Sequence, residues 1–329
     1  MNQKKLEKLL RSKTGYLKSG PSKVAEIFNV SEKVARQAIE VVKKENTFIE
    51  KEVAPVDTEY AEFLKWKETR KPKTKNDYKT PGKYIVLGCV HAPFHRENMI
   101  KGVIELLKDN KDTIKGFILA GDFLDMNSLS SHDRGKKPLT GVTLAWEYTQ
   151  ANKLLDELLK ELPKDVMKGY IYGNHEDRYK RYMSDIDNSK LGSALKSPTE
   201  ALKLAERGFE VYEDWKQDVI TLGNYLDVSH GEFFNTHSAK KHIDTYRRSM
   251  LYYHTHRIQQ YIEGSVGGFN GGSLADFDSP IFGYASRAMK SSWMNGFNTV
   301  DIDEDGFYHI QQIMCYNNKF VYGNKTYKF

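Results

Sequence analysis

The sequence has 329 residues, of which 39% are hydrophobic and 12% aromatic, so it can form a well-packed domain with a smaller accessory unit and is not disordered throughout. Its 50 basic and 44 acidic residues give a net charge of +6, which permits an anionic partner without requiring one. The two cysteines, Cys89 and Cys315, are too few for a disulfide framework and favour a reducing, cytoplasmic setting. No segment reads as a signal peptide or a membrane span, so we expect neither secretion by a standard signal nor membrane insertion.

Residues 1–52 have the apolar spacing of a small helical bundle. The pattern predicts helices over residues 4–10, 23–28 and 32–44, with Ser31 capping the third. This order resembles a helix-turn-helix, whose last helix would enter the DNA major groove. The candidate nucleic-acid contacts on that helix are Lys33, Arg36 and Lys43. A packing or oligomerisation module with a solvated basic face fits the same pattern, and the sequence leaves both readings open.

Residues 53–82 read as a basic linker. The segment is rich in Lys, Thr and Pro and lacks apolar periodicity, apart from a short helical pattern over residues 59–67. From residue 83 to residue 329 we expect one larger domain. Its strands over residues 84–88, 116–121 and 169–173 alternate with helices over 97–108 and 143–161, which indicates an α/β layered core. Short strands follow residue 207, and a second sheet packed on the first is the simplest architecture for them.

Polar residues with metal-binding side chains follow the three alternating strands. They are Cys89 and His91 after the first, Asp122 and Asp125 after the second, and Asn174, His175 and Glu176 after the third. Because ligand sites of open α/β sheets lie at the carboxyl ends of the strands, these residues should converge. His230 and the pair His254 and His256 follow later strands. In an extended strand, side chains two residues apart share a face, so His254 and His256 should point at one site.

This series of blocks resembles the calcineurin-like metallophosphoesterase superfamily, whose pattern runs DxH, GDxxD, GNH[DE], a lone H before G, and GHxH. The corresponding segments here are CVH at 89–91, GDFLD at 121–125, GNHE at 173–176, HG at 230–231 and YHTH at 253–256. The resemblance implies two packed β-sheets flanked by helices, a four-layer sandwich, over residues 83–329. With the N-terminal helices, the chain resembles helix-turn-helix-bearing members encoded by bacteriophages and prophages, so the cytoplasm could be that of a phage-infected bacterial cell.

The resemblance also implies a site with two divalent transition-metal ions, Zn, Fe or Mn. One ion would be held by Cys89, His91, Asp122 and His256, and the other by Asp122, Asn174, His230 and His254. Two cations about 3.5 to 4 Å apart clamp a phosphate and generate the hydroxide that attacks it. His175 would act as the general acid near the leaving group, while Asp125 and Glu176 would orient ligands. Arg178 and His237 are candidate substrate contacts. For His242 a surface or packing role is favoured, although it is, with His237, the likeliest of the remaining histidines to approach the substrate.

Two residues depart from the family pattern. Cys89 stands where the family has Asp, and Tyr253 stands where it has Gly. A thiolate is a softer ligand than a carboxylate, so ligation by Cys89 would bias that site towards zinc or iron. The other reading is that Cys89 is a small buried apolar residue beside a weakened first metal site. We expect the loop to absorb the larger side chain of Tyr253.

Three later segments have less specific patterns. The glycine-rich residues 264–273 read as a flexible loop at the rim of the site, residues 284–293 as a packed edge rather than a nucleic-acid clamp, and residues 316–329 as a last strand or hairpin.

The function that the sequence favours is hydrolysis of phosphodiester bonds in nucleic acid, DNA above RNA. The alternatives are a phosphatase or phosphodiesterase acting on phosphoproteins or small nucleotides, and a non-catalytic DNA-binding protein with a degenerate metal site. No membrane partner is expected, and the sequence does not define an oligomeric state.

Overall fold

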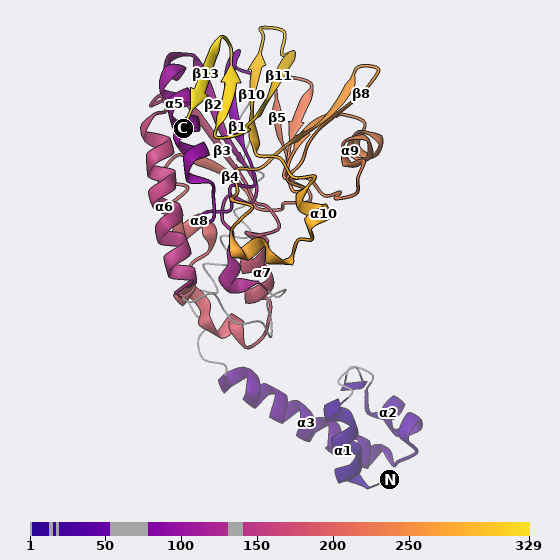
Figure 1. Cartoon of the computed structure of the whole chain (residues 1–329). Helices are drawn as coiled ribbons and strands as arrows, with labels where there is room; N and C mark the ends of the chain where they lie inside the picture. The colour runs from indigo at the N-terminus through magenta and orange to yellow at the C-terminus, as the bar shows by residue number, and fades with distance from the viewer. Residues whose placement is uncertain (1, 13–15, 18–19, 53–77, 131–140) are drawn as a thin grey trace. The chain divides into compact units, whose positions relative to one another are not determined.

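The computed structural model describes residues 2–12, 16–17, 20–52, 78–130 and 141–329 (Figure 1). The chain divides into two compact units, residues 1–74 and residues 75–329. The division falls inside the segment predicted as a linker, and the short helical pattern at residues 59–67 lies outside the described residues. Within the described part of the chain, no helix combines the length and the apolar character that crossing a membrane requires.

The smaller unit consists of α1 (Gln3–Ser12), α2 (Pro21–Phe28) and α3 (Glu32–Glu52). Its core contains Leu6 and Leu10 of α1, which pack with apolar residues of α2 and α3. Asn29 ends α2 in the left-handed conformation, at a φ of 49°, and Ser31 Oγ accepts a 3.4 Å hydrogen bond from the amide of Val34. The three predicted helices and the cap are confirmed. The third helix continues to Glu52 because no Gly or Pro follows its predicted end at residue 44.

A six-stranded sheet forms the centre of the larger unit, in the order β11-β10-β1-β2-β3-β4. Its strands are β1 (Gly82–Leu87), β2 (Ile114–Ala120), β3 (Met167–Ile171), β4 (Phe209–Tyr212), β10 (Gly296–Ile302) and β11 (Tyr308–Met314). The strands from β1 to β4 are parallel, whereas β10 and β11 are antiparallel to their neighbours. Since Tyr78 is buried in this unit, the folded domain begins before residue 83.

A five-stranded sheet, ordered β5-β6-β7-β9-β8, packs on the first. Its strands are β5 (Ile220–Leu222), β6 (Leu226–Val228), β7 (Ser249–Tyr252), β8 (Ile258–Glu263) and β9 (Val266–Gly271). The glycine-rich stretch is therefore strand β9 rather than a flexible loop. Its glycines let neighbouring groups approach closely, since a Cβ at Gly268 would lie 2.5 Å from the carbonyl oxygen of Ala239.

Helices cover the outer faces of both sheets (Figure 1). The main ones are α5 (Glu97–Asp109) and α6 (Leu144–Lys160) on the first sheet and α9 (Ser238–Tyr246) on the second, with shorter helices η2 (Lys111–Thr113), η3 (Asn127–Leu129), α7 (Asp177–Met183), η5 (Asn188–Ala194), α8 (Pro198–Ala201), η6 (Pro280–Tyr284) and α10 (Arg287–Lys290). A hairpin of β12 (Lys319–Tyr322) and β13 (Lys325–Lys328) ends the chain. The predicted α/β fold, with helices outside two packed sheets, is confirmed.

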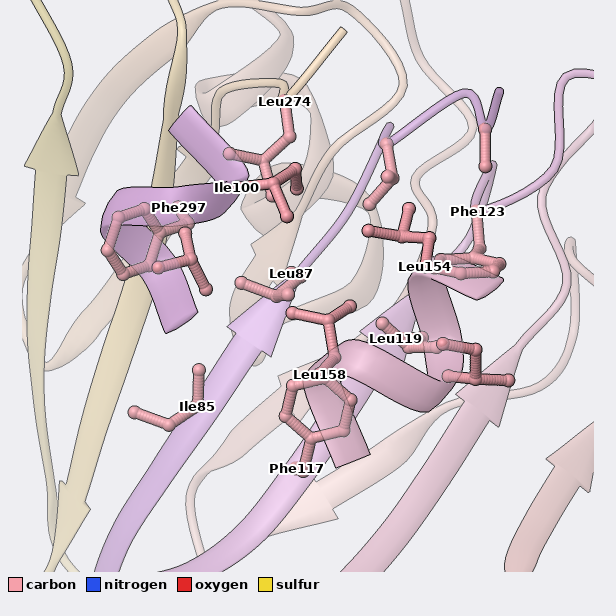
Figure 2. Packing of buried hydrophobic residues seen from close by; sticks show 14 of the residues in the cluster. Ile85, Leu87, Ile100, Phe117, Leu119, Phe123, Leu154, Leu158, Leu274 and Phe297 are labelled. Carbon is pink, nitrogen blue, oxygen red and sulfur yellow. The ribbon is translucent and has the colours of Figure 1, made fainter. Parts of the chain in front are cut away.

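The alternation of β1 shows how the sequence builds these layers. Ile85 and Leu87 point towards α5 and α6, in the cluster shown in Figure 2, whereas Tyr84 and Val86 point into the core between the sheets. Successive side chains of a strand face opposite sides, so a strand with layers on both faces is apolar throughout.

The assignment of strands to the second sheet was wrong for three segments. Strand β4 pairs with β3, β10 pairs with β1, and β11 pairs with β10, so all three extend the first sheet. The β10 strand is buried along nearly its whole length, as expected of an inner strand, but apolar pattern alone does not say which neighbour a strand takes.

Candidate metal centre

The predicted ligands lie in loops at the carboxyl ends of strands from both sheets. Loops after β1, β2 and β3 carry those of the first sheet, and loops after β6 and β7 carry the histidines of the second. Because β1, β2 and β3 are parallel to one another, as β6 and β7 are, their carboxyl ends meet at one edge of each sheet. The structure therefore brings the blocks together, as their place after strands predicts.

The local conformation of these loops differs from the expected extended strand. Five of the predicted ligands have left-handed backbone angles: Cys89 (48°), His91 (55°), Asp122 (50°), His254 (69°) and His256 (58°). For residues other than glycine this region is sparsely populated, costs about 1 to 3 kcal/mol per residue, and occurs mostly at functional sites. The paired histidines converge because their loops turn sharply, and the two-residue repeat of a strand was the wrong reason.

Backbone hydrogen bonds hold two of these loops together. The amide of Cys89 donates to the carbonyl of Gly121 at 3.0 Å, and the amide of His91 donates to the carbonyl of Asp122 at 2.9 Å. The loops after β1 and β2 thus continue the pairing of their strands, which fixes the strained residues in place.

One cluster, the first ligand group, consists of Cys89, His91 and His256. One ligand atom of each lies within 4.8 Å of the others, and all three side chains are buried. The Nε2 atoms of His91 and His256 are 3.0 Å apart. His91 Nδ1 lies 2.9 Å from Asp125 Oδ2, so Nδ1 donates a hydrogen bond to the ionised Asp125, and the lone pair of the neutral imidazole is on Nε2. His256 Nδ1 is buried without a hydrogen-bond partner among the described residues.

A second ligand group, Asn174, His230 and His254, gathers around one imidazole nitrogen. His230 Nε2 lies 2.9 Å from Asn174 Oδ1 and 3.2 Å from His254 Nδ1. The same nitrogen is 3.2 Å from Asp122 Oδ2, and that oxygen is 3.9 Å from His91 Nε2. Asp122 therefore stands between the two groups, where a bridging carboxylate would be needed.

The donor set suits divalent transition metals. The atoms that converge are imidazole nitrogens, a carboxylate, an amide oxygen and a sulfur, and few of them carry a proton. Atoms of these kinds are ligands of zinc and iron. The facing Nε2 atoms of His91 and His256 fit this reading, because His91 carries its proton on Nδ1 and the lone pair of its Nε2 is available to a cation. The residues present thus fit the group that the resemblance implies.

The electrostatics of the site favour the protonation states that metal ligands need. Burial lowers the pKa values of His254, to about 3, and of His91 and His256, so these imidazoles are neutral at pH 7. Burial opposes ionisation of Asp122, but the imidazoles of His230, His175 and His91 hold its pKa well below the usual value. Two ligands are held in the protonated state: burial, and then the charge of Asp122, raise the pKa of Cys89 well above its ordinary value, and, although burial lowers it, Asp122 raises the pKa of His230. A cation bound there must displace the thiol proton.

Glu176 ties the loops after β2 and β3 together. Its buried carboxylate accepts hydrogen bonds from the amides of Asp122 (3.0 Å), Leu124 (2.9 Å) and Gly173 (2.8 Å), and from the hydroxyl of Tyr170 (2.9 Å). It acts on the backbone that carries Asp122, whereas Asp125 contacts the side chain of His91 directly.

His175 and Arg178 lie side by side at the edge of the centre, each with a side chain 12% exposed. His175 Nδ1 is 2.7 Å from the carbonyl of Asp125 and must donate to it, which leaves Nε2 to accept from Arg178 Nη2 at 3.3 Å. His175 Nε2 is 3.9 Å from Asp122 Oδ2. Arg178 also donates to the carbonyl of Asp125 at 2.8 Å, so it is a built part of the site rather than an ordinary surface arginine.

The other candidate residues lie elsewhere. His237 is exposed at the N-terminus of α9. His242 is buried: its Nδ1 donates to the carbonyl of Ser238 at 2.8 Å and its Nε2 accepts from the amide of Glu232 at 3.2 Å, so it has the packing role that the sequence favoured. In the smaller unit, exposed side chains of α3 include Lys33, Arg36 and Lys43.

The tyrosine that replaces the family glycine is absorbed by two other glycines. Tyr253 is fully buried between the sheets, where a Cβ at Gly88 would lie 2.3 Å from its ring and a Cβ at Gly271 would lie 2.4 Å from it. Its hydroxyl donates to the carbonyl of Val86 at 2.9 Å and accepts from Asn298 Nδ2 at 2.8 Å. The sheet core accommodates the ring, whereas the sequence predicted that the loop would do so.

Aromatic side chains that the sequence did not single out pack against the ligands. The ring of Trp215 lies 6.0 Å from those of His230 and His254, while Phe282 and Trp293 contact the imidazoles of the first ligand group. The signal for the last of these was the aromatic-basic stretch at 284–293, which the sequence reading assigned to packing.

No protein-family model matches the chain, and no curated protein does. Among solved structures, Vps29 from Entamoeba histolytica complexed with zinc is 15% identical, with 70% of this chain and 98% of that chain covered and a TM-score of 0.34. Vacuolar protein sorting 29 from Cryptosporidium parvum is 15% identical over 75% and 94%, with a TM-score of 0.38. A predicted phosphoesterase from Streptococcus pneumoniae is 15% identical over 75% and 97%, with a TM-score of 0.33.

TM-scores this low carry no argument about activity. The resemblance to the calcineurin-like superfamily rests on the order of the five blocks, the two packed sheets and the way in which the blocks meet.

Proposed function

We propose that this chain is a dimetal-dependent phosphoesterase of the calcineurin-like type that hydrolyses phosphodiester bonds, with nucleic acid as its substrate. One observation carries the proposal: acceptor atoms from four other loops converge on Asp122, whose carboxylate lies between two groups of ligands. Such an arrangement has no use in packing alone, since burying these polar groups costs free energy that only a bound cation or a proton network returns.

When bound, two divalent ions would polarise a phosphate and supply a nucleophile at neutral pH. The residues that would hold them are Cys89, His91, Asp122 and His256 for one ion, and Asp122, Asn174, His230 and His254 for the other. The Cys89 thiolate biases the first position towards zinc or iron, with manganese more compatible with the second.

His175 and Arg178 supply the remaining chemistry. Since His175 Nδ1 donates to the carbonyl of Asp125, the imidazole can release a proton from Nε2 only after it has become doubly protonated. Arg178 Nη2 must then give up its hydrogen bond to Nε2, and Asp122 stabilises the imidazolium charge. Nε2 is then the atom that protonates the leaving oxygen. Arg178, held by the same carbonyl, places a fixed positive charge beside it that suits a phosphate oxygen.

The choice of nucleic acid is supported by the smaller unit. Three helices in the order of a helix-turn-helix present exposed basic side chains on α3, which favours DNA. Both cysteines are free thiols, which fits the proposed cytoplasmic setting.

Metal analysis and a diesterase assay test the catalytic part. Under reducing conditions at neutral pH, we expect about two equivalents of transition metal per chain and faster turnover of bis-p-nitrophenyl phosphate than of p-nitrophenyl phosphate. Cys89→Asp should keep two equivalents while shifting preference from zinc towards manganese, and Cys315→Ser, which changes the other buried thiol, should behave as wild type. Less than one equivalent in the wild type would refute an enzyme of this kind, and faster turnover of the monoester would make it a phosphatase.

Charge reversal tests the DNA-binding part. Replacing Lys33, Arg36 and Lys43 by Glu should weaken binding of a DNA duplex about tenfold or more in fluorescence anisotropy at low salt, while turnover of the small diester is unchanged. A matched control changes three exposed lysines of the larger unit to Glu: Lys108, Lys153 and Lys164. Equal loss in the two triple variants would mean that α3 has no special part in binding.

A further inference from the structure

An aromatic cluster supports one side of the metal centre. Its members, Phe277, Phe282 and Trp293, are called the aromatic base. The ring of Phe282 lies 5.4 Å from that of His91 and 5.7 Å from that of His256, and Trp293 lies 4.7 Å from His256. Phe277 lies 5.0 Å from Trp293, so the three rings pack with one another as well as with the ligands.

Hydrogen bonds fix this cluster to the rest of the site. The amide of Met294 donates to the carbonyl of His256 at 2.8 Å, and Lys290 Nζ donates to the carbonyl of Phe277 at 2.8 Å. Asn295 Nδ2 donates to the carbonyls of Ser273 and Ala275, at 3.2 and 2.8 Å. The aromatic base is therefore a rigid support, because its segment is bonded to the loop that carries His256 and to the segment after β9, whose Leu274 amide donates to the carbonyl of Cys89 at 3.0 Å.

Tyr284 stands on this support and is 62% exposed, whereas Phe282 beneath it is only 1% exposed. The two ring centroids are 6.4 Å apart. Partial burial, and then the charges of Asp125 and Asp122, raise the pKa of the Tyr284 hydroxyl to about 12. The phenol thus lies within the field of the carboxylates of the centre while its ring remains open to solvent.

We infer that Tyr284 is a stacking platform for an unpaired nucleobase of the substrate, next to the phosphate that the metal centre binds. The inference rests on the proposed phosphoesterase function and narrows its substrate class. An exposed, rigidly supported ring beside a phosphate site matches the way in which proteins bind single strands, through bases stacked on aromatic side chains and cations along the backbone. Arg287 supplies an exposed cation three residues further along the chain. A phosphorylated Ser or Thr side chain has no planar group for Tyr284 to stack on.

Two chromogenic diesters that share a leaving group separate the base from the phosphate. Thymidine 5′-(p-nitrophenyl phosphate) carries a base, and methyl p-nitrophenyl phosphate does not. With zinc or manganese added, Tyr284→Leu should lower kcat/KM for the thymidine ester about tenfold or more while changing that for the methyl ester less than threefold. Tyr284→Phe keeps the ring and should stay near wild type on both. The control is Tyr316→Leu, at a tyrosine 66% exposed in the turn between β11 and β12, and it should change neither.

Binding measurements make failure of the platform distinguishable from failure of the proposed function. In titration calorimetry, Tyr284→Leu should weaken the binding of thymidine 5′-monophosphate about tenfold and leave the binding of inorganic phosphate unchanged. Turnover of the methyl ester with no effect of Tyr284→Leu on the thymidine compounds would overturn the platform and leave the phosphoesterase standing. If Tyr284→Leu loses binding of thymidine 5′-monophosphate but the wild type hydrolyses neither ester, the result would refute the phosphoesterase and support the platform.

Discussion

A methyl group at Gly88 would collide with the ring that stands in the place of the family glycine. Its carbon would lie 2.3 Å from Cγ of Tyr253 and 2.5 and 2.6 Å from the two Cδ atoms, whereas carbon atoms in contact are about 3.5 to 4 Å apart. The ring cannot retreat, because Gly271 lies close on another side and the hydroxyl is bonded to Val86 and Asn298. We therefore expect Gly88→Ala to lower the free energy of unfolding by about 3 kcal/mol, the upper end for overpacking.

A double-mutant cycle isolates this contact. Tyr253→Ala alone should cost about 4 kcal/mol, as removal of a large buried ring does. In that background Gly88→Ala should be neutral or stabilising, because the methyl group enters the cavity, which gives a coupling energy of about 3 kcal/mol. Urea denaturation followed by tryptophan fluorescence measures all four corners, and Gly283→Ala, where a Cβ meets nothing within 4 Å, is the control. An equal cost of Gly88→Ala in both backgrounds would refute the reasoning.

Three further predictions concern residues around the centre. His175→Ala should reduce diester turnover roughly 100-fold while metal content stays near that of the wild type; parallel loss of metal would contradict its role as a proton donor. Glu176→Gln should lower the free energy of unfolding by about 2 to 4 kcal/mol, because the new amide nitrogen must face buried N–H groups whose hydrogen bonds the carboxylate accepted. A change below 0.5 kcal/mol in urea denaturation would be inconsistent with that network. Burial raises the pKa of Glu147 from 4.5 to about 7, so the folded state binds the proton more tightly and stability should fall by up to about 3 kcal/mol as pH rises from 4.5 to 7. Relative to Glu147→Gln, the wild type should show this loss in denaturation at pH 5 and pH 8, and a parallel pH dependence in both proteins would rule it out.

The convergence of the site was predictable because it depends on topology more than on detailed geometry. Residues that follow successive parallel strands must meet at one edge of the sheet, so the position of Asp122 and Asn174 after apolar runs was enough to place them together. The alternation of short apolar strands with helical patterns likewise indicated the layered α/β core. Both inferences depend on the order of elements along the chain, which is why they held without knowledge of side-chain contacts.

What the sequence did not predict depends on contacts between distant segments. Nothing local distinguishes β10 as a partner of β1 or the glycine-rich β9 as an inner strand, since pairing is decided by which faces the rest of the chain covers. The left-handed conformations of the ligand loops are similar. For Cys89 and His91 they are set by hydrogen bonds to the loop after β2, more than 30 residues away.

The two departures from the family pattern meet at a single contact between the sheets. Cys89 follows Gly88, and the ring of Tyr253 fills the space beside Gly88 that a side chain would occupy. The amide of His254, the residue after Tyr253, donates to Cys89 Sγ at 3.2 Å. The ring therefore fixes the distance between the loop after β1 and the loop after β7, and the sulfur bonds across the gap that the ring maintains. A carboxylate at position 89 would meet a spacing set by the tyrosine, with Asp122 as a second negative charge nearby. The metal preference of the Cys89→Asp variant therefore depends on the whole contact between the loops after β1 and β7. The identity of residue 253 should influence that preference as strongly as the change from sulfur to oxygen.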